Sequence, residues 1–204
     1  MSKVRALLGA LLMFIAAFVM SAQVREDPLE VVRSTADQVL ERVVSQRAEL
    51  EAAPRKVYEL VNQIVLPRFD FTYMSRLVLG RYWQRASTTQ QQEFTTEFRE
   101  LLVRTYATAL LNYSGQEIVY LPLRMNADET TVKVNTRVQA SGAPPIPIDY
   151  SLYLSSSGRW LVYDVAIDNI SLVSQYRNSY ATQIKRFKMD GLIDNMKKLN
   201  RKDG

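Results

Sequence analysis

The sequence of 204 residues contains no cysteine and no histidine. Without these residues the chain can form no disulfide, no thiolate nucleophile, no histidine general base and no zinc site built from Cys or His. It is rich instead in apolar side chains, which make up 47% of its residues, and it has 11 Tyr, 7 Phe and 7 Met. This composition favours a protein that binds an apolar ligand over one that cleaves a substrate.

The N-terminus has the pattern of a bacterial export signal. Two basic residues stand near its start, an apolar run follows from Leu7 to Val19, and Ala22 is a small residue at the expected cleavage point. The run is short for a membrane span, which needs about 20 residues; a retained N-terminal anchor is the alternative. Cleavage near Ala22 predicts a signal peptide over residues 1–22 and a single domain over residues 23–204, located in the periplasm.

Helical patterns dominate the first half of the expected domain. Asp27 and Pro28 form a helix start, and apolar residues then recur at spacings of three and four. Asp70 can cap another helix, and Gly80 suits its end. The helices are expected over about 28–51, 54–66, 71–79 and 88–114.

After Gly115 the period of the apolar residues becomes that of strands. Residues 131–139 alternate cleanly between apolar and polar side chains. Strands are expected over 117–125, 131–139, 148–154 and 159–167, and helices over about 171–188 and 190–200. Short turns between the strands predict an α+β fold with a curved four-stranded antiparallel sheet and several helices packed against it. The pattern alone leaves open whether the interface is filled, which is the commoner outcome, or encloses an apolar cavity.

Two acidic residues at the end of the last expected strand are the candidates for catalysis. Asp164 and Asp168 lie four residues apart, and a carboxylate pair can act as acid and base. One aspartate with Tyr150 or Tyr163 could also serve an enolisation on a hydrophobic substrate. The structural alternative, which we favour, is that Asp168 caps the next helix and Asp164 pairs with an arginine. The sequence shows no Gly-rich phosphate loop, metal-ligand cluster or Gly-x-Ser-x-Gly motif.

Basic residues gather near the C-terminus. They suit a solvated helix end beside the helix dipole, and they also suit attraction to anionic lipid headgroups or to an acidic partner. They do not interleave with aromatic residues along a strand, so nucleic-acid binding is not expected. The residues are Lys185, Arg186, Lys188, Lys197, Lys198, Arg201 and Lys202.

Two segments carry a family resemblance. The first begins at Phe69 with the letters FDFTYM and continues to Leu102; the second begins at Val162 and reads VYDVAIDNISLVSQYR. Together they closely resemble the MlaC family, also known as the toluene-tolerance Ttg2 family. Asn169 stands where that family often has glycine, and asparagine tolerates the left-handed backbone region well.

The resemblance implies a cone-shaped fold, NTF2-like in outline, in which the sheet and helices enclose an apolar cavity. It implies a periplasmic carrier of the maintenance-of-lipid-asymmetry system, without enzymatic activity, that holds phospholipid acyl chains and leaves the headgroup near the mouth. Its implied partners are an inner-membrane ABC transporter with an MCE-domain subunit and an outer-membrane lipoprotein–porin complex. We expect a monomer with no cofactor and with phospholipid as its cargo.

The walls of this cavity are expected from the strands and the helices, and for each residue the alternative is ordinary core packing. The strand residues are Val132, Val134, Val138, Ile148, Tyr150, Leu152 and Leu154. The last strand contributes either Trp160 and Val162 or the alternate set Leu161, Tyr163, Val165 and Ile167, because the pattern does not fix its register. The helix residues are Met74, Leu77, Val78, Phe94, Phe98, Leu101, Leu102 and Tyr106. Tyr176 and Arg177 are expected at the mouth.

Overall fold

The computed structural model describes residues 26–202, so the expected signal peptide, residues 1–22, lies outside the described residues. Asp27 starts helix α1 (Pro28–Ser45) by accepting a hydrogen bond from the Leu29 amide at 2.9 Å. The helix that we expected to reach residue 51 is interrupted at Gln46, where φ is −108° and ψ is 17°, and α2 (Arg47–Ala52) follows it.

Helices α4 (Phe71–Leu79) and α5 (Thr88–Ala107) begin where their capping residues predict. Helix α3 (Lys56–Ile64) begins two residues after Pro54, where we expected it to open. Asp70 accepts a hydrogen bond from the Tyr73 amide at 2.8 Å at the start of α4, and Ser87 and Gln90 form a capping box at the start of α5. Gly80 ends α4 with φ of 52°, a backbone conformation that favours glycine. The elements are α3 (Lys56–Ile64), η1 (Leu66–Arg68), α4 (Phe71–Leu79), η2 (Gly80–Arg85), α5 (Thr88–Ala107) and η3 (Thr108–Asn112), where η denotes a 3₁₀ helix.

The strands form one antiparallel meander in the order of the sequence, as predicted. The sheet has five strands rather than four, because a tight turn at Asp168 and Asn169 adds a short strand, β5. Both turn residues have positive φ, 50° and 64°, so Asn169 does adopt the left-handed conformation. The strands are β1 (Glu117–Tyr120), shorter than expected, β2 (Thr131–Gln139), β3 (Ile146–Leu154), β4 (Trp160–Ile167) and β5 (Ile170–Ser171).

A bulge in β4 resolves the register that the sequence left open. Leu152 pairs with Val162, but Ser151 pairs with Asp164, so Tyr163 is the extra residue. Residues of both alternative sets therefore lie on one face of the sheet, together with Tyr150 and Leu152. Before the bulge these are Trp160 and Val162, and after it they are Val165 and Ile167. This face, which we call the inner face, also carries Val132, Val134, Thr136 and Val138.

The last helix, α6 (Leu172–Lys202), bends at Lys188, where φ is 62° and ψ is 179°. The bend lies at the boundary between the two helices predicted there. Beyond it the helix runs along α5, where Lys197 forms an ion pair with Glu93 at 3.2 Å and Asn200 donates to the Glu97 carbonyl at 3.0 Å.

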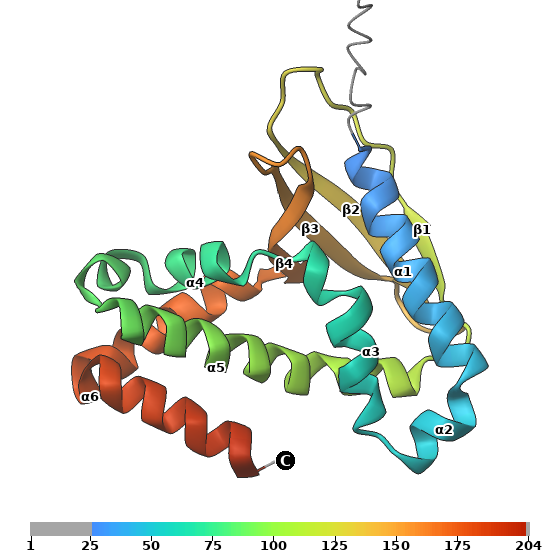
Figure 1. Cartoon of the computed structure of the whole chain (residues 1–204). Coiled ribbons are helices and arrows are strands. Elements are labelled where there is room, and N and C mark those ends of the chain that lie inside the picture. Colours follow the sequence, from blue (N-terminus) through green and yellow to red (C-terminus); the bar gives the residue numbers. More distant parts are fainter. Residues whose placement is uncertain (1–25, 203–204) are drawn as a thin grey trace, which may run out of the picture.

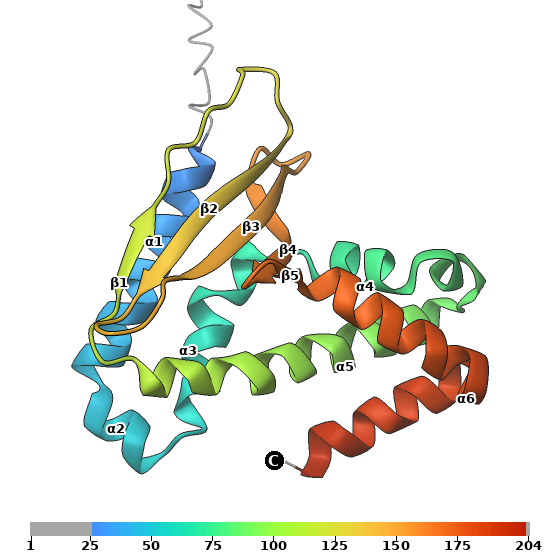
Figure 2. The same ribbon diagram turned by 180° about the vertical axis from the view of Figure 1, so that it is seen from behind.

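Two hydrophobic clusters hold these elements together. The first joins the inner face to the start of α1, to α4, to much of α5 and to α6. The second joins the rest of α1 to α2, α3 and the end of α5. Figures 1 and 2 show α1 on one face of the sheet and α4 and α6 extending to one side from its β4 edge. Helix α5 runs from that side to beneath the sheet, where it reaches α3. Among the described helices, none has the length and hydropathy needed to cross a membrane.

Candidate functional site

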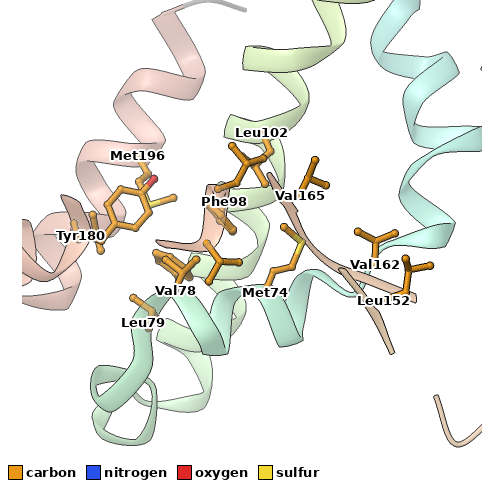
Figure 3. Close-up of a cluster of buried hydrophobic side chains, with 14 of the residues drawn as sticks. Met74, Val78, Leu79, Phe98, Leu102, Leu152, Val162, Val165, Tyr180 and Met196 are labelled. Carbon is orange, nitrogen blue, oxygen red and sulfur yellow. The ribbon is translucent and has the colours of Figure 1, made fainter. Parts of the chain in front are cut away.

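The structure brings the expected wall residues into a single cluster. All of them except Val138 and Leu161 belong to the first hydrophobic cluster or pack against it. Figure 3 shows part of this cluster, with Met74 and Val78 from α4, Phe98 and Leu102 from α5, and Val162 and Val165 from β4. Sheet and helices therefore face each other across an apolar interior.

Many of these residues form a closely packed centre. Phe94, Phe98, Val134 and Leu152 have no exposed surface. A side chain with no accessible surface has no water-sized space beside it, because the wall of an enclosed void would itself be accessible. Ring centroids of Phe94 and Phe98 lie 5.7 Å apart, and Tyr180 packs edge-on against Phe94 at 5.6 Å. These residues are the structural core of the protein.

The remaining wall residues are only half-buried. They surround the packed centre on the inner face and along α4 and α5, and they retain accessible apolar surface. They are Leu77, Leu101, Tyr106, Val132, Val138, Ile148, Tyr150, Leu154 and Ile167.

Three further apolar residues line the same interior, although the sequence did not lead us to expect them there. Tyr120 in β1 and Leu123 and Met125 in the following segment are half-buried and pack against the same cluster. Tyr120 pairs with Thr136 of β2, which places its ring on the inner face. All three lie in residues 117–125, which we expected to form the first strand, so the apolar residues of that segment could have indicated their place in the wall.

Tyrosine hydroxyls are the main polar groups in this interior. Burial raises the pKa of Tyr150 to about 12, and a hydrogen bond with Thr136 acts in the opposite direction. Burial also raises the pKa of Tyr120 to about 12, and its hydroxyl makes no hydrogen bond in the described structure. Burial likewise raises the pKa of Tyr106, and it raises the pKa of Tyr176 to about 12. Neutral hydroxyls among apolar side chains suit an apolar ligand with a few polar atoms.

Leu161, from the alternate set, and Tyr163 are the expected wall residues that lie on the other face of the sheet. Tyr163 belongs to a group of tyrosines there. Its ring centroid is 5.3 Å from that of Tyr73 and 6.2 Å from that of Tyr153. Tyr153 alternates with the inner residues Leu152 and Leu154, so this tyrosine group is on the opposite, outer face. The bulge at Tyr163 is the reason, because it shifts the alternation of β4 by one residue.

The expected mouth residues have structural contacts. Tyr176 is half-buried, and its ring lies 5.2 Å from Phe98 and 5.5 Å from Tyr180. Arg177 is exposed, and its Nε donates a hydrogen bond to the Leu77 carbonyl at 2.8 Å, which ties α6 to α4.

The two candidate catalytic aspartates do not form a working pair. Asp164 accepts hydrogen bonds from the Ser171 hydroxyl and the Val173 amide at the start of α6. Asp168 is exposed in the turn before β5. We favoured structural roles in which Asp168 caps the helix and Asp164 pairs with an arginine. The structure instead makes Asp164 the capping residue, and its partners are Ser171 and Val173 rather than an arginine. Within residues 26–202, no group of three or more acidic residues is placed to hold a metal ion.

Comparison with known proteins points to one family. The family pattern described as MlaC protein matches residues 33–198. Toluene tolerance protein ttg2D of Pseudomonas putida is 26% identical over 177 residues, which cover 86% of this chain and 81% of that protein. The intermembrane phospholipid transport system binding protein MlaC of Haemophilus influenzae is 26% identical over 171 residues, which cover 83% and 80%.

A solved structure is similar over nearly its whole length. It is that of the phospholipid-binding protein from Ralstonia solanacearum in complex with a phospholipid. The match has a TM-score of 0.80 and 34% sequence identity, and it covers 87% of this chain and 99% of that chain.

Proposed function

This chain belongs to the MlaC family, and from this membership we propose that it is a carrier that binds the acyl chains of a phospholipid in its apolar interior and moves the lipid between two membranes. The observation that supports this proposal most is the similarity to a protein solved with a phospholipid bound, at 34% identity and a TM-score of 0.80. The interior of this chain has the matching chemistry, since it is apolar and contains few polar groups.

We place the acyl chains against the half-buried part of the wall. The fully buried centre leaves no room, whereas Leu101, Ile148 and Tyr150 keep accessible surface. These residues come from α5 and from the inner face, so acyl chains between them would widen the space between helix and sheet. The closely packed centre would stay intact and preserve the fold while the lipid enters and leaves.

The free energy of transfer explains why the interior must enclose the lipid. At about 0.8 kcal/mol per buried CH₂, two acyl chains of about 15 carbons represent on the order of 25 kcal/mol. A carrier must offset nearly all of this free energy to take a lipid out of a bilayer, but a much tighter site would not release it. Apolar walls with few polar groups satisfy both conditions and predict tolerance of different headgroups.

The location and partners belong to the same proposal. Residues 1–22 would direct export and be removed, which leaves residues 23–204 as the mature carrier in the periplasm. A transporter in the inner membrane, with an MCE-domain subunit, and a lipoprotein–porin complex in the outer membrane would exchange lipid with it. We propose no enzymatic step, because the carrier only needs to bind and release its cargo.

Native mass spectrometry of the protein purified from bacterial periplasm tests the proposal. We expect one or a small whole number of phospholipid molecules per protein, which organic extraction removes and incubation with vesicles restores. A protein that is free of lipid, and that takes up none from vesicles, would show that the proposal is wrong. A pulldown from membrane extracts with the loaded and the extracted protein would test the two partners separately.

A further inference from the structure

A positively charged hollow lies where the bend of α6 meets η2. It has a volume of about 400 Å³. Arg85, Lys185 and Lys188 line it together with four uncharged residues, Tyr82, Ala86, Ile184 and Met189. No acidic residue is among those that line it. Figures 1 and 2 show the bend of α6 and the chain that follows α4 at the same end of the molecule, far from α2.

The surroundings of the hollow add further positive charge. Arg81 donates a hydrogen bond to the Tyr82 hydroxyl at 3.3 Å, and Arg186 lies over the ring of Phe187. The pKa of Tyr82 is lowered, first by its hydrogen bond from Arg81 and then by nearby charges that include Lys185. The acidic residue nearest in sequence, Asp190, already accepts a hydrogen bond from Gln90 at 2.6 Å.

The backbone at Lys188 gives an independent indication that this place has a function. Its φ of 62° and ψ of 179° belong to a region that is essentially restricted to glycine. Such strain is concentrated at functional sites, where a particular side chain is retained despite its backbone. Here the strained residue is a lysine whose side chain lines the hollow.

An exposed aromatic residue lies beside the hollow. Phe187 is 44% exposed, directly before Lys188, and the guanidinium of Arg186 lies 4.9 Å from the centre of its ring. Basic residues beside an exposed aromatic ring are typical of segments that bind at the surface of a bilayer, where cations meet phosphates and the ring enters the headgroup layer.

We propose that this end of the protein docks on an anionic bilayer, with a lipid phosphate in the hollow and Phe187 in the headgroup layer. The hollow matches the headgroup region of such a bilayer because its exposed lining residues are cationic, whereas Ile184 and Met189, which are more buried, are apolar. An acidic protein would satisfy the cations but would leave the exposed Phe187 without a comparable environment. The docking surface does not depend on the cargo, since a protein without bound lipid presents the same charges.

Flotation of the purified protein with vesicles tests the proposal. One set of vesicles is phosphatidylcholine alone, and in the other about a third of the lipid is phosphatidylglycerol. We expect binding to the anionic vesicles only, weakened as salt rises above about 0.15 M. Equal binding to both kinds of vesicle, or to neither, would overturn the proposal.

Variants with matched charge locate the surface. The triple variant Arg85→Gln, Lys185→Gln and Lys188→Gln should weaken vesicle binding by roughly tenfold or more. The control, Arg55→Gln, Lys133→Gln and Arg137→Gln, changes the net charge equally at exposed positions elsewhere and should weaken it by about twofold at most. Equal losses in the two variants would mean that only the overall charge matters, which contradicts the proposal.

Two single variants, a second binding assay and a separate readout of lipid uptake complete the test. Lys188→Gly removes a charge, suits the backbone and should also reduce binding, so the result does not depend on the triple variant being folded. Phe187→Ser should reduce binding without a change in charge.

If the three cations are needed for binding to immobilised polyglutamate but not to vesicles, the surface docks an acidic protein and the proposal is wrong. Lipid uptake measured by mass spectrometry is a separate readout, so a failure of docking is distinguishable from a failure of lipid carriage.

Discussion

Asp164 accepts a hydrogen bond from the amide of Val173 at 3.0 Å, which connects the end of the sheet to the first turn of α6. Its second oxygen accepts one from the Ser171 hydroxyl at 2.5 Å, and the Ser171 oxygen accepts one from the Ser174 amide at 3.1 Å. The carboxylate thus satisfies amide and hydroxyl donors at the positive end of a helix, which is a structural role.

We expect Asp164→Asn to lower the free energy of unfolding by about 1–2 kcal/mol, because it removes a charge and an acceptor at the helix start. Urea denaturation followed by circular dichroism measures the change. Asp168→Asn is the matched control at the exposed turn and should change the free energy by no more than about 0.5 kcal/mol. Similar losses in both variants would contradict the role of Asp164 as a cap.

Two tyrosine hydroxyls should differ sharply in their contribution to stability. Tyr153 donates a hydrogen bond to the Asp70 carboxylate, whereas the buried Tyr120 hydroxyl makes no hydrogen bond in the described structure. Tyr153→Phe should cost about 1–2 kcal/mol of unfolding free energy, and Tyr120→Phe should be neutral or stabilising. Thermal and urea denaturation of the two variants test this difference. A loss at Tyr120 as large as that at Tyr153 would show that the Tyr120 hydroxyl has a partner.

The elements that local chemistry determines were predicted well from the sequence. Capping residues fix the starts of α4 and α5, because a cap acts on the amides of the next three residues. The register of β4 could not be predicted in this way. The bulge at Tyr163 depends on how β4 pairs with β3. Both registers considered from the sequence assumed regular alternation along β4, so neither included an extra residue.

The candidate site shows the same division. Alternation in β2 and β3 correctly assigned Val134 and Leu152 to the inner face. It could not tell that these two have no exposed surface whereas Ile148 keeps some, because that difference depends on which helix lies opposite each residue. Burial of this kind is a property of tertiary packing and not of periodicity.

Filling the half-buried wall should reduce the amount of lipid bound. Leu101→Trp places a larger side chain beside the space that we propose for acyl chains, so phospholipid per protein should fall by about half or more. Leu110→Trp is the control, because it makes the same change at a half-buried residue of the second cluster. Native mass spectrometry after incubation with vesicles gives the ratio. Equal occupancy in the two variants would place the acyl chains elsewhere.

Two residues at the bend of α6 should respond oppositely to substitution: Gly191 has no room for a side chain, whereas Lys188 has a backbone conformation that suits glycine. A Cβ added at Gly191 would lie 2.7 Å from the Cβ of Phe187, which is too close, so Gly191→Ala should destabilise the protein by about 1–3 kcal/mol. This reverses the usual effect of replacing glycine by alanine within a helix, which is a gain of about 1 kcal/mol. Lys188→Gly should instead stabilise the fold by about 1 kcal/mol, because it relieves a strained backbone. Urea denaturation decides both signs, and a stabilising Gly191→Ala would mean that α6 can straighten.

Tyr150 should make stability dependent on pH in the alkaline range. Burial raises its pKa from 10.0 to about 12 in the folded protein. Between these values the unfolded chain loses the phenolic proton while the folded chain keeps it, so the unfolded state binds fewer protons and stability falls as pH rises. The contribution of Tyr150 to the free energy of unfolding is fully present below pH 10 and is lost as pH rises through about 12.

Tyr150→Phe should therefore make the alkaline decline shallower, by up to about 1.4 kcal/mol per pH unit. Urea denaturation at several values from about pH 9 to about pH 12 measures the slope. Ile148→Val, at a neighbouring position on the inner face, lowers stability without removing a titrating group, and it should leave the slope unchanged. If Tyr150→Phe and the wild-type protein decline in parallel, Tyr150 titrates alike in the folded and unfolded states, and its hydroxyl is in contact with water.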